Sequence, residues 1–335
     1  MLEQINLFFN EESHTYTDGK TNYVSVTTLI GGFDEAFDAD YWAMYRALEQ
    51  NESYKAVPFP TKKQVRINYG GANVTLNLNI FKGGYIPVYK SLEEIKNEWI
   101  KNGEMASTEG SKEHSYIEDI INECSTENVN YENAKFNSIL KGSYKKVDLR
   151  KLVSSKLRTS HELVLKTLVF YLQKGYNLLT EVRIYDSEYK VAGTIDALFV
   201  KGKDVVVMDW KTNKEDIKFV AGSYKKEWNA FRTKKIRTDV FNKRSTKMKA
   251  PLNDLYSCKG NLYTMQLSTY AYILERWGFN VQGLILVHIK PETNSEDDII
   301  YDEFNNRVIK EIKVLKLQYL KDHVLKMLNF HASRV

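Results

Sequence analysis

The sequence predicts an α/β protein in which helices cover a central mixed β-sheet. One observation is the order of the expected elements, which are a helix over 156–175, three strands over 178–186, 189–200 and 204–211, a helix over 261–277 and a strand over 283–289. The second is the run from Val205 to Met208, which is apolar at consecutive positions. Such a run is typical of a strand that is buried on both faces, and it indicates the middle of the sheet.

The remaining pattern predicts further elements on both sides of this core. We expect a β-hairpin over 14–24 that turns at Asp18-Gly19, a helix over 34–50, a β-rich insertion over 56–90, helices over 91–102 and 105–124, a short strand near 299–304 and a long helix over 306–329. The helix expected over 91–102 begins with the capping box Ser91-Leu-Glu-Glu. We therefore divide the chain into an N-terminal region, 1–104, and a core, 105–335.

Composition excludes several classes of protein. Cys124 and Cys258 lie far apart in the chain, which argues against a disulfide scaffold, a zinc ribbon and an iron–sulfur cluster. The N-terminus has no basic segment followed by a long apolar run, and no stretch approaches the roughly 18 apolar residues of a membrane span. We expect an intracellular, soluble, cytoplasmic protein with no membrane partner.

The positive charge of the chain is local. Segment 218–249 holds eleven Lys and Arg residues against Glu227 and Asp239, and it interleaves them with aromatic residues such as Tyr224 and Phe241. Basic side chains neutralise phosphates, and aromatic rings stack on unpaired bases. We expect this basic insertion to guide a DNA strand through Lys225, Lys226, Arg232, Lys234, Lys235, Arg237, Lys243 and Arg244. The alternative is a solvated loop that does not touch a substrate.

The strongest candidate site lies on the hairpin of strands 189–200 and 204–211. If Gly202-Lys203 is a two-residue loop, Asp196 lies opposite Asp209, with Cβ atoms about 4.5–5.5 Å apart. Two like charges that close destabilise each other unless a cation sits between them. Lys211 projects on the same face as Asp209. Paired carboxylates and a lysine suit a Mg²⁺ or Mn²⁺ ion that activates water; the alternative is an ion pair at a strand end.

These residues resemble a known family. Gly193-Thr-Ile-Asp196 followed by Asp209-Trp-Lys211 resembles the PD-(D/E)XK nuclease superfamily, particularly its RecB-like and phage-type exonuclease branch. Further similar motifs occur in the expected order: His14-x-Tyr16 and Ser25-Val-Thr near the N-terminus, the GxxxH helix Gly110–His114 with Glu118, Glu181 on the strand before Asp196, Pro251-Leu252, and the QxxxY motif Gln266–Tyr270. The resemblance covers residues 105–290 well and 14–30 loosely.

The resemblance implies a restriction-endonuclease-like core and a role for each matched residue. Asp196 and Asp209 would bind the metal, with the Trp210 carbonyl as a third ligand, and Lys211 would position the attacking water. His114 would lie in or beside the metal site, and Glu181 would bind a second metal. The remaining matched residues would support the site or contact DNA; they are Gln266, Tyr270 and Ser25. Alternatives stay open, since His114 and Tyr270 also suit core positions, Glu181 a solvated charge, and Ser25 a cap of the turn after it.

We therefore expect a metal-dependent DNA nuclease, preferentially an exonuclease on single-stranded or end-containing DNA in recombination, repair or replication. A replication or recombination protein is a candidate partner, in a bacterial or phage-infected cell. One alternative is a structure-specific endonuclease of the same superfamily. Another is a non-catalytic nucleic-acid-binding or virion-associated protein that retains the fold. RNA remains an alternative substrate.

Overall fold

The structure is a computed structural model, and it describes residues 7–10, 15–49, 64–69, 72–77, 92–128, 145–229 and 235–334. The chain divides into two compact units. The larger comprises Met1–Glu35 together with Lys112–Val335, and the smaller is Ala36–Ser111. This division differs from the predicted one after residue 104, because the N-terminal strands belong to the sheet of the larger unit.

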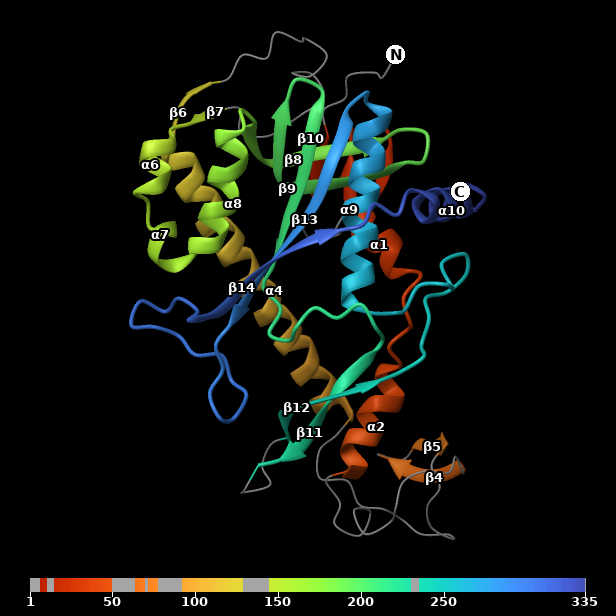
Figure 1. The fold of residues 1–335 in the computed structure, drawn as a ribbon. Coiled ribbons are helices and arrows are strands. Elements are labelled where there is room, and N and C mark those ends of the chain that lie inside the picture. Colours follow the sequence, from red (N-terminus) through yellow and green to blue (C-terminus); the bar gives the residue numbers. More distant parts are fainter. Residues whose placement is uncertain are drawn as a thin grey trace. The chain divides into compact units, whose positions relative to one another are not determined.

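A mixed sheet forms the centre of the larger unit, as predicted (Figure 1). Its strand order is β1 (Phe8–Asn10), β2 (Thr15–Thr17), β3 (Asn22–Ser25), β9 (Val191–Lys201), β10 (Asp204–Lys211), β13 (Asn280–Pro291) and β14 (Ile309–Leu317), with β8 (Asn177–Asp186) also paired to β9. The pairs β3–β9 and β10–β13 are parallel, and the others are antiparallel. The run from Val205 to Met208 is fully buried, which confirms β10 as a central strand.

Helices cover both faces of this sheet. One core lies under α1 (Val26–Gly31), α9 (Lys259–Arg276) and α10 (Lys321–Ala332). The other lies under the C-terminal part of α4 (Leu92–Glu123), with α6 (Leu149–Val153), α7 (Leu157–Ser160) and α8 (Glu162–Gln173). Because each core residue of β10 points to one of these two layers, the strand is apolar without alternation.

The smaller unit and two further strand pairs of the larger unit complete the described elements. The smaller unit contains α2 (Ala39–Glu49), the N-terminal part of α4 and a hairpin of β4 (Gln64–Tyr69) and β5 (Ala72–Asn77). This hairpin confirms β-structure within the 56–90 insertion, whose other residues lie outside the described ranges. The larger unit adds β6 (Ser125–Asn128) with β7 (Lys145–Val147), and β11 (Gly222–Trp228) with β12 (Lys235–Lys243). Among the described residues, no helix is long and apolar enough to cross a membrane.

Two predicted helix boundaries were wrong. The helices expected over 91–102 and 105–124 form the single helix α4, which continues through Gly103. A glycine inside a helix costs only about 1 kcal/mol relative to alanine, so it does not by itself end one. Conversely, the helix expected over 156–175 is interrupted at His161, whose backbone leaves the helical region at φ −135° and ψ 49°.

The C-terminal prediction was also wrong in its first half. Instead of one helix over 306–329, the chain forms β14 and then the shorter α10. β14 pairs along β13 from Leu284↔Leu317 to Pro291↔Ile309. It satisfies the backbone groups on the outer edge of β13, which would otherwise lack partners. The strand expected near 299–304 is reduced to the isolated bridges Thr293↔Ile299 and Tyr301↔Arg307.

Candidate active site

The turn between β9 and β10 has the predicted length. The antiparallel register runs from Asp204↔Lys201 to Met208↔Ala197, which leaves Gly202 and Lys203 as a two-residue loop. Gly202 has a φ of +59°, the left-handed conformation that this kind of hairpin turn requires and that glycine adopts without strain. The register from which the candidate site was predicted is therefore confirmed.

The ladder ends one pair before the two aspartates, so Asp196 and Asp209 are not themselves a backbone-paired position of the sheet. Asp196 instead turns an oxygen toward the neighbouring backbone, and its Oδ2 accepts the Trp210 amide hydrogen bond at 3.0 Å. The backbone of Asp209 pairs with Leu286 of β13 on its other side. The two carboxylates still influence each other, because the charge of Asp196 contributes to the raised pKa of Asp209.

A distortion in β9 and β8 explains why the ladder ends there. Ile195 and Ala197 are two residues apart and would share a face in a regular strand, yet they pack into opposite cores. On β8, the pairs Thr180↔Ala197 and Val182↔Ile195 skip Glu181, whose φ is +50°. Both strands are therefore irregular at the same level, where Glu181 and Asp196 lie.

Glu181 lies near the other acidic residues of the candidate site. Its side chain reaches the protein surface, yet its carboxylate is partly withdrawn from water and has other carboxylates as neighbours. This desolvation, with the charges of Asp196, Glu118 and Asp209, raises the pKa of Glu181 to about 8. A nearby cation would stabilise the charged form of an acidic group in this environment.

Asp209 and Lys211 form the buried centre of the site. Asp209 is 1% exposed, and its Oδ2 lies 2.5 Å from Lys211 Nζ. Lys211 is the partner of this buried oxygen, which has no further hydrogen bond. Burial and the Asp196 charge raise the pKa of Asp209. Burial alone would lower the pKa of Lys211, but Asp209 and Asp196 outweigh it and raise that pKa.

Helix α9 supports this centre through three residues at positions i, i+3 and i+7, which share one face of the helix. Gln266 donates to Asp209 Oδ1 at 3.3 Å and to the Tyr270 hydroxyl at 3.0 Å. Tyr263 places its ring 5.2 Å from Lys211 Nζ and donates to Asn213 Oδ1 at 2.8 Å. The supporting roles of Gln266 and Tyr270 fit this geometry. Sequence reasoning missed Tyr263, although its spacing from Gln266 was a usable signal.

Tyr270 is buried directly against Gly193, the first residue of the GxxD match. A Cβ at position 193 would lie 2.5 Å from Tyr270 Cε1, which is too close for any side chain. We expect Gly193→Ala to lower the free energy of unfolding by about 1–3 kcal/mol, because it overpacks a buried contact. Urea unfolding measures this change. Gly31→Ala, at a helical glycine with no atom within 4 Å of the added Cβ, is the control and should not destabilise the chain.

Helix α4 brings a histidine and a further carboxylate to the site. His114 Nδ1 lies 3.5 Å from Asp196 Oδ2, as the predicted role of this histidine requires. Glu118, one helical turn later, accepts a hydrogen bond from Thr180 Oγ1 at 3.4 Å, and burial is the main cause of its raised pKa. The sequence placed Glu118 on the His114 face but assigned no role to it. The structure adds it as a carboxylate beside Glu181.

The N-terminal strands border the same region. Tyr16 and Thr194 share a hydrogen bond at 3.0 Å between their hydroxyl oxygens, which joins β2 to β9 two residues before Asp196. Ser25 is the N-cap of α1, where its Oγ accepts the Thr28 amide hydrogen bond at 3.0 Å. The capping alternative for Ser25 therefore holds.

The basic segment forms the β11–β12 hairpin. Lys226, Lys243 and Arg244 are exposed on it, and Lys225 is paired with Glu227 at 2.6 Å. Arg237 is mostly buried in an ion pair with Asp297 rather than extended into solvent. Lys235 begins β12, while Arg232 and Lys234 lie outside the described residues.

Within the described part of the chain, no three His, Cys, Asp or Glu side chains stand as a ready group for a metal ion. His114, Glu181 and Asp209 are neighbours of Asp196 with suitable donor atoms. Trp210, whose carbonyl was predicted as a ligand, buries its side chain in the core and pairs its backbone with Val287. Comparison of the chain with protein-family models, with curated proteins and with solved structures gave no match.

Proposed function

We propose that this chain is a metal-dependent nuclease that hydrolyses the phosphodiester bonds of DNA. The observation that carries the proposal is the buried carboxylate of Asp209, which lies next to Asp196 and against Lys211 at the end of a central strand. A structural ion pair would not need a second carboxylate there, since the added negative charge destabilises the first. A site for a cation explains why both are present.

The donor set fits Mg²⁺ or Mn²⁺, which prefer carboxylate oxygen ligands. The Oδ2 atom of Asp209 is buried with Lys211 as its partner, and Asp196 is its carboxylate neighbour. These two residues would hold the ion, with His114 beside Asp196 and the Trp210 carbonyl and Glu181 as further candidate donors. The bound ion would polarise the phosphate and lower the pKa of a coordinated water.

The protein groups around the site then have defined tasks. Gln266 holds Asp209 Oδ1, and the Trp210 amide holds Asp196 Oδ2, so both carboxylates have a set orientation. Lys211 is oriented by Asp209 on one side and by the Tyr263 ring on the other. In this position its ammonium group would orient the attacking water and offset the negative charge that develops on the phosphate.

DNA is the proposed substrate because the basic hairpin belongs to the same unit as the site, and lysine and arginine neutralise a phosphate backbone. Action as an exonuclease on single-stranded or end-containing DNA rests on the resemblance of the QxxxY and N-terminal residues. Recombination, repair or replication is the corresponding process. A replication or recombination protein remains a proposed partner.

The decisive experiment compares end-labelled linear with closed circular single-stranded DNA, each incubated with Mg²⁺ or with EDTA. We expect the linear form to be shortened with Mg²⁺ and to survive in EDTA. Cutting of the circle would identify an endonuclease, and preferential cutting of a matched RNA would change the substrate. If Mg²⁺ and Mn²⁺ both leave every substrate intact, the proposed function is wrong.

A further inference from the structure

Basic and aromatic residues form cross-strand pairs in the β11–β12 hairpin. Cross-strand partners share a face, and the register pairs Tyr224 with Phe241 and, beyond an irregularity after Tyr224, Lys226 with Arg237. The Tyr224 and Phe241 rings meet edge to face, with centroids 5.2 Å apart. Arg237 covers the Tyr224 ring at 5.5 Å. The rings and Arg237 are therefore occupied within the protein, while Lys226 is exposed.

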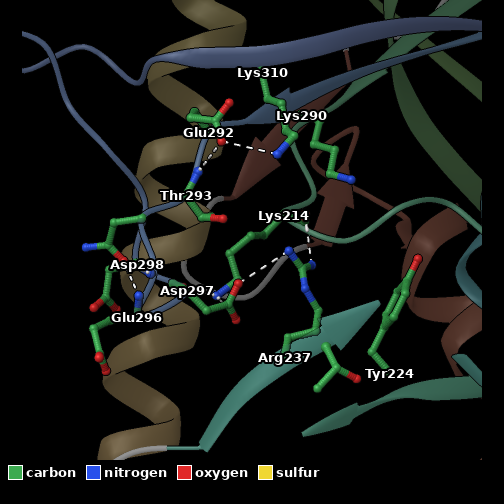
Figure 2. Close-up of polar contacts among 12 residues, drawn as sticks. Lys214, Tyr224, Arg237, Lys290, Glu292, Thr293, Glu296, Asp297, Asp298 and Lys310 are labelled. Atoms are coloured by element: carbon green, nitrogen blue, oxygen red, sulfur yellow. Dashed lines mark hydrogen bonds and ion pairs between the residues drawn. The ribbon is translucent and has the colours of Figure 1, made fainter. Parts of the chain in front are cut away.

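An ion-pair network attaches this hairpin to the rest of the larger unit (Figure 2). Arg237 Nη2 lies 3.3 Å from Asp297 Oδ1, and Arg237 Nη1 donates to the Lys214 carbonyl at 3.2 Å. Lys214 Nζ lies 2.9 Å from Asp297 Oδ2 and also donates to the Asp297 carbonyl at 2.7 Å. The Arg237 and Asp297 side chains are 14% and 13% exposed, so water screens their attraction only weakly.

Two further contacts attach the hairpin at other points. Asn229, directly after β11, donates to Glu296 Oε2 at 2.8 Å. The Tyr224 hydroxyl donates to Asp216 Oδ2 at 3.2 Å. Asp216 also binds Lys290 of β13 at 2.9 Å and Lys313 of β14 at 3.3 Å. The hairpin is thus held to the segment after β10, to the loop after β13 and, through Asp216, to the edge of the sheet.

The anchor is connected to the candidate active site by a short stretch of chain. Lys214 is three residues after Lys211, the last residue of β10. The carbonyl that accepts the Arg237 hydrogen bond therefore lies just beyond the strand that carries Asp209. Asp297 is itself held in the left-handed region at φ +61°, with its amide donating to the Asn294 carbonyl at 3.0 Å. These contacts attach the hairpin close in the chain to Lys211.

We propose that the hairpin is a fixed binding surface for the phosphate backbone of the DNA strand that enters the metal site, with Asp297 and Arg237 as its anchor. Lys226, Lys243 and Arg244 contact phosphates, and Arg237 is a positioning residue. The role rests on the proposed nuclease function. This positioning role differs from direct phosphate binding by Arg237. If Arg237 is an anchor, tight DNA binding requires Asp297, although Asp297 is an acidic residue.

Asp297→Asn distinguishes a positioning role of Arg237 from direct phosphate binding by Arg237, because the substitution removes a negative charge. Electrostatics alone predicts tighter binding to DNA, whereas loss of the anchor predicts weaker binding. Glu292→Gln is the matched control, since Glu292 lies in the same loop but does not contact the hairpin residues drawn in Figure 2. Its carboxylate pairs with Lys310 at 3.2 Å. Affinity of the full chain for a fluorescent single-stranded oligonucleotide, and for its duplex, is measured in EDTA across a salt titration.

We expect Asp297→Asn to weaken single-strand binding and to lower kcat/KM about tenfold to a hundredfold, as for a misplaced binding element. Lys226→Ala should reduce the salt slope by about 1, and Glu292→Gln should bind no more weakly than the parent chain. The inference fails if Asp297→Asn binds as tightly as Glu292→Gln, or if Lys226→Ala leaves the salt slope unchanged. Preference for the duplex would also overturn it. Binding without cleavage in Mg²⁺ would instead contradict the proposed nuclease function alone.

Discussion

Replacing Asp209 with Asn is expected to lower the rate of DNA cleavage by roughly a thousandfold or more, because charge stabilisation by a metal ion contributes several kcal/mol. Asn keeps the shape of the side chain and the acceptor for Gln266, and Asp196 remains as a negative charge near Lys211, so the sheet should still form. The loss should therefore fall on catalysis. Initial rates with an end-labelled single strand at saturating Mg²⁺ measure it, and calorimetric titration with Mn²⁺ measures ion binding.

Asp204→Asn is the matched control for this substitution. Asp204 lies at the opposite end of the same strand, where it accepts hydrogen bonds from Asn280 and Gln282. It should keep parental cleavage and Mn²⁺ affinity. Cleavage by Asp209→Asn within tenfold of the parental rate would contradict the assignment of Asp209 as a metal ligand.

Glu181→Gly is expected to make the chain more stable and less active. The positive φ of Glu181 strains any residue with a Cβ. Glycine removes this strain of about 1–2 kcal/mol, which exceeds the roughly 0.5–1 kcal/mol that glycine costs inside a strand. It also removes a carboxylate beside Asp196 and Glu118. Cleavage should fall roughly tenfold to a hundredfold, as when a residue that supports a metal site is lost. Urea unfolding in EDTA measures the expected gain in stability, and initial cleavage rates measure the expected loss of activity.

Lys190→Gly provides the comparison that separates strain from chemistry. Lys190 has nearly the same φ, +52°, and lies exposed in the turn between β8 and β9. It should gain stability without losing activity. Destabilisation of the chain by Glu181→Gly in EDTA would contradict the backbone strain at Glu181. Cleavage of DNA by this variant at the parental rate would contradict a role of the Glu181 carboxylate in the site.

Local sequence determined a large part of this protein. The Gly202-Lys203 turn and the strands on either side follow from short-range chemistry, namely a two-residue loop between apolar runs. This was enough to bring Asp196, Asp209 and Lys211 together, and helical spacing was enough to place Gln266 with Tyr270 and His114 with Glu118. Periodicity and turn geometry act over a few residues, so they are readable without the fold.

Tertiary structure alone decided the features that depend on distant partners. Residues 309–317 became a strand because the edge of β13 needed backbone partners, which no local pattern records. Glu181 took up a strained backbone and Asp196 turned to the Trp210 amide because two strands are distorted at one level. Arg237 became an anchor rather than an exposed contact because Asp297, sixty residues away in the chain, lies beside it. In each case the deciding interaction joins groups that only the folded chain brings within a few ångströms.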